Sequence, residues 1–303
     1  MKIIMNYTIK QSASGQTVEK YLKSLGYSQS LLRQLRNTPD GITIDNTLVY
    51  TTYRLSEGQN LTISFPEETG SDNIVPVPMS LTIPYEDEHL MVINKASGIP
   101  IHPSQGNYDN TLANGIAYYL GEKGESCTYR VINRLDRDTT GLLIIAKNPL
   151  SACILSNMVK NRTIKRRYLA IAKGKLPDQG IIDAPIARVT DSTIERCVDF
   201  ERGESAITHY KRLWYDNSTD HSLAALQLTT GRTHQIRVHL KYIGHPLPGD
   251  FLYCEDYRYI NRQALHSWSL DFTHPILGTA MHFEAPLPED MRFTGIKDNL
   301  FTN

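Results

Sequence analysis

The sequence predicts an α+β fold, because segments with the character of strands outnumber segments with the character of helices. The two kinds of segment do not alternate regularly, as they would in a doubly wound α/β protein. The chain has 303 residues, of which 40% are apolar and 21% are charged. Such a chain can fill a sizeable core, either as one large domain or as a large domain with a small one.

The first 66 residues are expected to form a small domain of their own. Val18, Tyr21, Leu22 and Leu25 recur at helical spacing, and Gly26 ends this helix. The other elements expected here are a helix over 29–36 with Ser28 as its N-cap, a turn at Asp40-Gly41, a strand at 42–44 and a strand at 61–65.

Residues 67–80 predict a linker, since they are acidic and rich in Pro, Ser and Gly. Residues 81–303 are then expected to form one larger domain. Its expected elements are two short strands within 81–95, a helix that starts at Asn148-Pro149, strands at 164–172 and 223–229, and a helix that starts at Thr230-Gly231-Arg232 and ends at Gly244.

Charge is unevenly distributed along this chain, although its net charge is zero. Residues 67–90 carry six acids and no Lys or Arg, whereas residues 130–175 carry eleven Lys and Arg and two acids. This segregation indicates a basic face for a polyanion. A solvated surface that is balanced by acids nearby in space would give the same pattern.

The segment VINRLDRDTTGLLIIAKN at 131–148 places Asp136 between Arg134 and Arg137, directly before the apolar run at 142–146. Guanidinium groups near a carboxylate favour its ionised form, which suits a nucleophile or a base. An ordinary surface ion pair is the commoner cause of such a pattern. The apolar run is expected to be a buried strand, which would hold the preceding loop at the rim of a core, where reactive groups are often mounted.

A second candidate segment, TTGRTHQIRVHLKYIGHPLPGD at 229–250, contains no acid before Asp250. A phosphate-binding helix start is one interpretation, and a solvated basic helix is another. A zinc site is not favoured, because His234 and His239 would lie on different helix faces and no Cys is nearby. The basic or titratable side chains of this segment are Arg232, His234, Arg237, His239, Lys241 and His245.

A third candidate segment, IKRRYLAIAKGK at 164–175, places Tyr168 in a strand behind Lys165, Arg166 and Arg167. Basic residues beside an exposed ring can hold a nucleic-acid backbone while the ring stacks on a base. A tyrosine in a strand is also common in protein cores, so this segment alone leaves both interpretations open.

The chain shows neither a charged-then-apolar signal segment nor a long apolar run. We therefore expect a cytoplasmic protein with no membrane association. Four scattered cysteines without CxxC spacing are expected to be reduced and mostly buried: Cys127, Cys153, Cys197 and Cys254.

Taken together, these segments resemble the RluA-type family of RNA pseudouridine synthases. The family pattern HRLD-x-x-TSGLLLxAK corresponds to residues 133–147, its tyrosine strand to 165–170, and its L-x-TGRxHQIRxHL motif to 228–240. Further matches are YEDEHLMVINKASG at 85–98, HPLPGDFLY at 245–253 and ALHSWSLDFTHP at 264–275, so that the resemblance covers residues 81–290.

The chain departs from the family pattern at three positions, where Asn133 replaces the usual His, Thr140 the usual Ser and Ala96 the usual Pro. The aspartate, its neighbouring arginine and the glycine of the motif remain. The N-terminal unit weakly resembles the small αL RNA-binding module of many of these enzymes, although it is poor in basic residues.

The resemblance implies a mixed, mostly antiparallel twisted sheet with flanking helices, and an enzyme that isomerises specific uridines in ribosomal or transfer RNA. The uracil–ribose C–N bond breaks and a C–C bond forms at C5 of the base, which must first leave its stack. No cofactor and no metal is implied, and RNA is the expected partner of what we expect to be a monomer.

The same resemblance assigns roles to individual residues. Asp136 is the catalytic carboxylate, as nucleophile or as base, and Arg237 is its salt-bridge partner. Tyr168 would stack on the flipped uracil and could take part in proton transfer, while Arg134 would fill the space that the base vacates. The contacts expected with substrate and RNA are Arg134, Arg137, Lys165, Arg166, Arg167, Arg232, His234 and Ile236.

Two other functions fit parts of the pattern. A catalytically inactive RNA-binding protein on the same scaffold would share the basic segments. A hydrolase would pair Asp136 with a histidine such as His234, but complete hydrolase motifs are missing. The set of Asp136, Tyr168 and Arg237 favours the synthase, and the sequence names neither its RNA nor its uridine.

Overall fold

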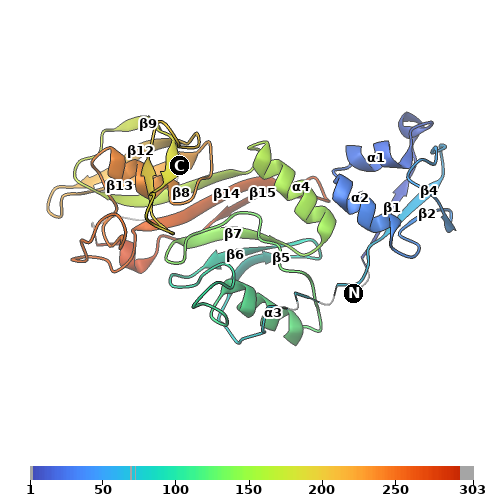
Figure 1. Cartoon of the computed structure of the whole chain (residues 1–303), viewed down its shortest axis with the longest axis horizontal. Helices are drawn as coiled ribbons and strands as arrows, with labels where there is room; N and C mark the ends of the chain where they lie inside the picture. The colour runs from blue at the N-terminus through green and yellow to red at the C-terminus, as the bar shows by residue number, and fades with distance from the viewer. Residues whose placement is uncertain (1–2, 69, 72, 294–303) are drawn as a thin grey trace.

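The computed structural model describes residues 3–68, 70–71 and 73–293, which form two lobes (Figure 1). The four strands of the smaller lobe make an antiparallel sheet in the order β1-β4-β2-β3. Its elements are β1 (Ile4–Thr8), η1 (Gln11–Ala13), α1 (Val18–Ser24), α2 (Gln29–Arg36), β2 (Ile42–Ile44), β3 (Thr47–Leu48) and β4 (Asn60–Ser64).

The small lobe has a hydrophobic core of its own, built by the apolar stripes of its two helices against its sheet. Leu22 of α1 and Leu35 of α2 are buried in one cluster with Leu61 of β4. The hydroxyl of Ser28 accepts the N–H of Leu31 at 3.2 Å, which confirms the expected N-cap of α2. The bounds 1–66, 67–80 and 81–303 stay a prediction, although β4 ends before the expected linker and β5 begins after it.

The expected linker has no helix or strand among its described residues, yet it lies against the larger lobe. The N–H of Val77 donates to the carbonyl of Asn114 at 3.2 Å, and the Asn114 amide donates back to the carbonyl of Val75 at 2.8 Å. Nearer its start, the carboxylate of Glu68 forms an ion pair with Arg130. These contacts show that this linker is packed rather than a free tether.

The larger lobe contains one mixed sheet in the order β5-β6-β7-β14-β8-β13-β12-β9, with β15 paired to β14. The pairing of β14 with β7 is parallel, whereas the other pairings in this sheet are antiparallel, which confirms the α+β fold class. Its elements are β5 (Thr82–Glu86), β6 (Leu90–Lys95), α3 (Leu112–Glu122), β7 (Thr140–Ala146), α4 (Pro149–Lys160), β8 (Lys165–Lys173), β9 (Gln179–Asp183), β10 (Ile186–Arg188), β11 (Arg196–Val198), β12 (Ile207–Asp216), β13 (His221–Leu228), α5 (Gln235–Tyr242), β14 (Leu265–Thr273), β15 (Ala280–Glu284) and η2 (Glu289–Met291).

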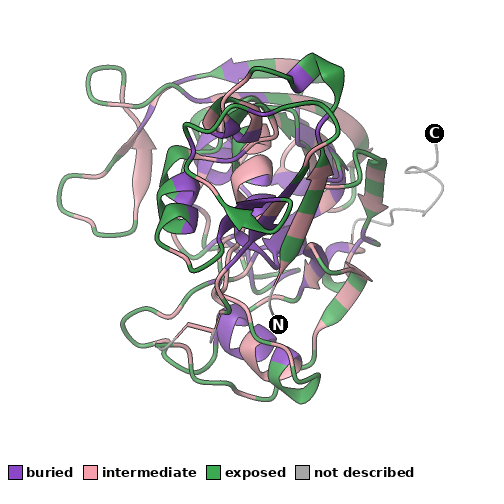
Figure 2. Ribbon diagram, turned by 90° about the vertical axis from the view of Figure 1, so that its right-hand side faces the viewer, coloured by how far each residue is buried: buried purple, intermediate pink, exposed green. Residues whose placement is uncertain are grey.

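Helices pack on both faces of this sheet, so its central strands are buried. Figure 2 shows buried residues gathered towards the centre of the molecule. On one face, Ile116 of α3 and Leu240 of α5 share a core cluster with Ile145 of β7. On the opposite face, Leu155 of α4 packs with Ile144 of β7. Strands between two helical layers read as continuous apolar runs, which explains the sequence of β7.

Strand β7 fixes the loop that carries Asp136. All seven of its residues are buried, as expected for the apolar run at 142–146. Gly141 has φ +108°, and a Cβ at this position would collide with the carbonyl oxygen of Ser267 in β14. The close parallel pairing of β7 with β14 therefore requires glycine here.

Helix α4 connects the two lobes. Asn148 caps its first turn and Pro149 is its first residue, as expected. Leu150 at this end belongs to the core cluster of the small lobe, and Ile154 packs where Gly26 leaves room for it. The other end of the helix, at Lys160, reaches the cleft described below.

Two further expectations concern cysteines and membranes. Among the described residues, no helix has the length and apolar character needed to cross a bilayer. The four cysteines are free, but each is only partly buried: Cys127, Cys153, Cys197 and Cys254.

Candidate active site

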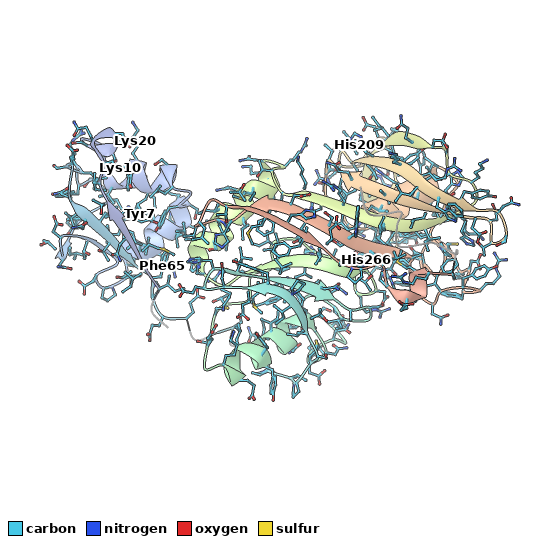
Figure 3. All side chains as sticks on the ribbon, turned by 180° about the vertical axis from the view of Figure 1, so that it is seen from behind. Tyr7, Lys10, Lys20, Phe65, His209 and His266 are labelled. Carbon is cyan, nitrogen blue, oxygen red and sulfur yellow. The ribbon has the colours of Figure 1, made fainter. Side chains whose placement is uncertain are left out.

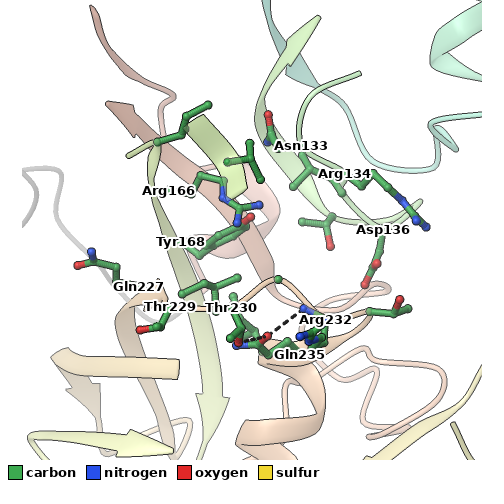
Figure 4. A pocket seen from close by; sticks show the side chains of 18 of the residues that line it. Asn133, Arg134, Asp136, Arg166, Tyr168, Gln227, Thr229, Thr230, Arg232 and Gln235 are labelled. Carbon is green, nitrogen blue, oxygen red and sulfur yellow. Dashed lines mark hydrogen bonds between the residues drawn. The ribbon is translucent and has the colours of Figure 1, made fainter. Parts of the chain in front are cut away.

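A cleft of about 690 Å³ opens where the loop before β7 faces the start of β8 and the turn before α5 (Figure 4). Its volume lies within the roughly 300–1,000 Å³ typical of small-molecule sites. Asp136 lies on one wall and Tyr168 on the wall opposite, while Gln235 lies between them at the base of the view. Segments far apart in the sequence thus meet around one opening.

The loop that carries Asp136 is held from two neighbouring strands. The side-chain oxygen of Asn133 accepts the N–H of Ile144 in β7 at 2.9 Å. The buried ammonium group of Lys95, at the end of β6, donates to the carbonyl of Arg137 at 2.7 Å. Burial lowers the pKa of Lys95 to about 7. The loop is therefore anchored on both sides of Asp136.

Arg237 is the cation that holds the carboxylate of Asp136. Its Nη1 donates to Asp136 Oδ2 at 2.9 Å, while Nε and Nη2 donate to the two oxygens of Asp250 at 2.7 Å each. The side chains of Arg237 and Asp250 are 2% and 0% exposed, whereas that of Asp136 is 29% exposed. Burial alone would lower the pKa of Arg237, but the hydrogen bonds that it donates to Asp250 and the charge of Asp136 raise it above its usual value.

His234 is the second group near this carboxylate. Its Nε2 lies 3.9 Å from Asp136 Oδ2, and its Nδ1 lies 2.9 Å from the hydroxyl of Tyr253. Burial lowers the pKa of His234, which favours its neutral form.

The turn before α5 corrects the expected helix start. Helix α5 begins at Gln235, because His234 has φ +58°, in the left-handed region that a helix cannot contain. The Gln235 amide organises this turn: its oxygen accepts from the Thr230 hydroxyl at 2.8 Å and from the Arg232 N–H at 2.9 Å. The helix start expected at Thr230-Gly231-Arg232 is therefore wrong. The interpretation of these residues as a phosphate-binding helix start is not supported either, because the helix begins after them.

Strand β8 presents three of its first four side chains to the cleft: Lys165, Arg166 and Tyr168. Tyr168 and Arg166 line it together, whereas Arg167 is not among the lining residues and bonds to Asp271 at 3.2 Å. Successive side chains of a strand point to opposite faces, which separates Arg167 from its two neighbours. Tyr168 is 4% exposed, and its hydroxyl has no hydrogen-bond partner among the residues that the structure describes.

The arginines adjacent to Asp136 do not pair with it. Arg137 donates from Nε and Nη2 to the carboxylate of Asp138, with the Nη2 distance 2.9 Å, and it does not line the cleft. Arg134 does line the cleft, but in the described part of the chain no ion pair joins it to Asp136. The expectation that these two arginines hold the carboxylate is therefore wrong; the ion pair is made by Arg237, the residue that the family resemblance names as its partner.

Positive charge dominates the cleft. Asp136 is the one acid among the described lining residues. The Arg232 guanidinium is paired with Glu204, and Arg237 with its two aspartates. Five other cations line the cleft without an ion pair to any residue that the structure describes: Arg134, Lys160, Arg162, Lys165 and Arg166. Such a surface attracts a polyanion.

The sequence profile of the RNA pseudouridylate synthase family matches residues 89–242, which include the walls of this cleft up to Arg237. The chain is an RluA-type RNA pseudouridine synthase. Its function is thus enzymatic, and neither the inactive binding protein nor the hydrolase describes it.

Relatives of the synthase match it over most of their length. The "Uncharacterized RNA pseudouridine synthase YjbO" of Bacillus subtilis is 43% identical over 276 residues, which are 91% of this chain and 96% of the relative. The "Ribosomal large subunit pseudouridine synthase D" of Vibrio vulnificus is 34% identical over 96% of this chain and 93% of its own. The structure titled "Human RNA Pseudouridylate Synthase Domain Containing 1" covers 73% of this chain and 86% of its own, with 26% identity and a TM-score of 0.57.

The two motif departures near Asp136 have defined partners in the synthase. Asn133 bonds to β7, as described above, and is 3% exposed. The Thr140 hydroxyl lies 2.8 Å from Nδ1 of the buried His266. Asn133 thus attaches the loop to β7, whereas Thr140, the first residue of β7, contacts β14.

Sequence reasoning missed several residues around the site of the synthase. Asp250 was available as a signal, because it is the acid that closes an otherwise acid-free segment. Tyr253 and Lys95 gave no signal of their own. Ile236, for which a substrate contact is expected, lines the cleft and also packs in the core; the contact itself stays a prediction. In the described residues, no group of three or more His, Cys, Asp or Glu side chains is arranged to bind a metal.

Proposed function

We propose that the synthase isomerises specific uridines of ribosomal or transfer RNA with Asp136 as its catalytic carboxylate. One observation carries this assignment: a carboxylate at the cleft with one oxygen held by a buried guanidinium. Asp136 Oδ2 accepts from Arg237, whereas no described group bonds to Oδ1. The free oxygen is thus available to a substrate in the cleft.

The chemistry needs an ionised carboxylate beside the ribose. Breaking the C1′–N1 bond can begin with attack of Oδ1 on C1′ or with removal of the C2′ proton. Either step releases the uracil through N1, and the base then turns so that C5 faces C1′. On the first route C5 bonds to C1′ as the Oδ1–C1′ bond breaks; on the second, C2′ regains its proton as C5 bonds to C1′. On both routes the C5 proton then leaves and N1 takes up a proton, which gives the isomer. Both starting steps use the free oxygen Oδ1, while Arg237 holds the carboxylate in place through Oδ2.

Other cleft residues support the extruded nucleotide. A uridine must leave its stack to reach Asp136, because its reacting atoms are inaccessible in a helix. The Tyr168 ring faces the cleft opposite Asp136 and offers a stacking surface for the flipped uracil (Figure 4). Arg134, on the wall of Asp136, has the charge and reach to occupy the vacated space.

Positively charged side chains indicate which parts of the protein surface would contact RNA. The unpaired cations of the cleft would contact phosphates near the target uridine. On the small lobe, Lys10 and Lys20 are exposed at its outer side (Figure 3), and Arg33 and Arg36 are exposed on α2. We propose that this lobe adds a second RNA contact, and that the enzyme acts in the cytoplasm as a monomer. Relatives named for the large ribosomal subunit favour ribosomal RNA as the substrate.

The test is pseudouridine mapping in ribosomal and transfer RNA from cells that lack the gene and are complemented with variants. The wild-type gene should restore specific pseudouridines. Asp136→Asn should restore none, while the purified variant binds RNA with unchanged affinity. Asp138→Asn is the matched control, since its carboxylate lies two residues away and pairs with Arg137 outside the cleft. Pseudouridine formation by Asp136→Asn would refute the assignment.

A further inference from the structure

Tyr253 lies behind the active site and contacts both groups that approach Asp136. Its ring centroid is 5.0 Å from the guanidinium carbon of Arg237 and 5.7 Å from the imidazole of His234. Its hydroxyl oxygen accepts the backbone N–H of Arg196 at 2.9 Å and lies 2.9 Å from His234 Nδ1. The residue is 6% exposed.

A count of protons fixes the direction of the bond between Tyr253 and His234. A phenol carries one O–H donor, and a buried donor needs an acceptor. The Arg196 N–H has only a proton to offer, so within the described residues His234 Nδ1 is the acceptor left for the Tyr253 hydroxyl. Nδ1 therefore carries no proton.

The surroundings of the other ring nitrogen agree with this assignment. In a neutral imidazole one nitrogen carries the proton and the other accepts. With Nδ1 as acceptor, Nε2 carries the proton, and Nε2 is the atom that lies 3.9 Å from Asp136 Oδ2. The opposite tautomer would direct a lone pair at this carboxylate oxygen and would leave the Tyr253 O–H unpaired.

We propose that Tyr253 is a positioning residue that locks His234 in the Nε2–H tautomer, so that the imidazole presents a donor to Asp136 and to the bound ribose. This inference rests on the proposed role of Asp136. Hydrogen bonds in a free enzyme are often long and tighten when substrate binds, so the present 3.9 Å gap can close to a bond in the complex.

The fixed tautomer of His234 has two chemical consequences. Arg237 and His234 both approach Oδ2, so Oδ1 remains the oxygen that faces the substrate. The imidazole is also unable to act as a base toward the substrate, because its accepting nitrogen is occupied by Tyr253. Burial lowers the pKa of His234, which supports the neutral form that this arrangement requires.

The direct test is the tautomer itself, measured by long-range ¹H–¹⁵N NMR on the ¹⁵N-labelled wild-type protein. Subtracting the spectrum of His234→Gln assigns the signals among the ten histidines. We expect a protonated Nε2 and an unprotonated Nδ1. In Tyr253→Phe, which keeps the ring but removes the hydroxyl, the Nδ1-protonated form should become populated. A proton on Nδ1 in the wild-type protein would overturn the proposal.

Kinetics on substrate RNA test the consequence for catalysis. Tyr253→Phe should lower kcat about 10-fold, as expected for loss of a group that orients a catalytic residue, with KM unchanged. His234→Gln places an amide N–H near the position of Nε2 and should retain more activity than His234→Leu. Wild-type kcat in Tyr253→Phe, or equal loss in the two His234 variants, would overturn the proposal. The NMR experiment needs no substrate turnover. If the proposed role of Asp136 were wrong, the kinetics would show it, while the tautomer of His234 could still be measured.

Discussion

Replacing Asp250 with asparagine should destabilise the synthase more than the same replacement at Asp136. Both carboxylates bond to Arg237, yet they differ in burial: the Asp250 side chain is 0% exposed and that of Asp136 is 29% exposed. Asp250 receives two of the three bonds that Arg237 donates to carboxylates, and it also accepts the N–H of Leu252 at 3.1 Å.

The magnitudes follow from what each variant leaves unpaired. Asp250→Asn leaves a guanidinium that is 2% exposed with Asp136 as its one remaining anionic partner among the described residues, and removal of one member of a buried ion pair costs about 3–5 kcal/mol. Asp136→Asn leaves the bidentate pair with Asp250 intact and costs about 1 kcal/mol, the net value of one hydrogen bond. A total stability of about 5–15 kcal/mol makes this difference large.

Thermal unfolding followed by tryptophan fluorescence provides the assay. Both tryptophans, Trp214 in β12 and Trp268 in β14, belong to the large sheet, so the signal reports on the lobe with the active site. At about 2 °C per kcal/mol for a domain of this size, Asp250→Asn should lower Tm by about 6 °C or more and Asp136→Asn by about 2 °C. Equal Tm shifts in the two variants would refute the conclusion that Asp250 is the more stabilising partner of Arg237.

Two further predictions concern Tyr168 and His266. Tyr168→Phe should keep the KM for RNA, because it keeps the ring, whereas Tyr168→Leu should raise KM about 10-fold by removing a stacking surface worth about 1–3 kcal/mol; an unchanged KM in Tyr168→Leu would exclude stacking. His266, which is buried in β14 (Figure 3), has its pKa lowered by burial to about 4 from 6.5. Because the unfolded chain takes up this proton first, stability should be complete above pH 6.5 and fall by about 3 kcal/mol towards pH 4. The free energy of unfolding, measured against pH, should fall less steeply below pH 6.5 in His266→Gln than in the wild-type protein. Identical slopes would contradict the conclusion that His266 causes this loss of stability.

Much of the fold could be predicted from local sequence. The caps at Ser28 and Asn148, the buried strand after Asp136 and the strand with Tyr168 all occur where their local chemistry places them. Capping, periodicity and apolar runs act over a few residues, so they can be recognised without knowledge of the fold. The exception was the start of α5, which depends on the left-handed conformation of His234 and the bonds of Gln235.

The sequence by itself determined which motif surrounds Asp136 and that this carboxylate precedes a buried strand. The charge pattern around Asp136 pointed to the wrong cations, the family resemblance named Arg237, and the tertiary structure shows how Arg237 reaches the carboxylate. Arg134 and Arg137 are its neighbours in sequence, but its partner is Arg237, which lies 101 positions away and is oriented by Asp250. Electrostatic interaction depends on distance in space and on burial. Arg137 therefore pairs with Asp138 and Arg134 lines the cleft, while the fold brings a remote guanidinium to 2.9 Å from Asp136.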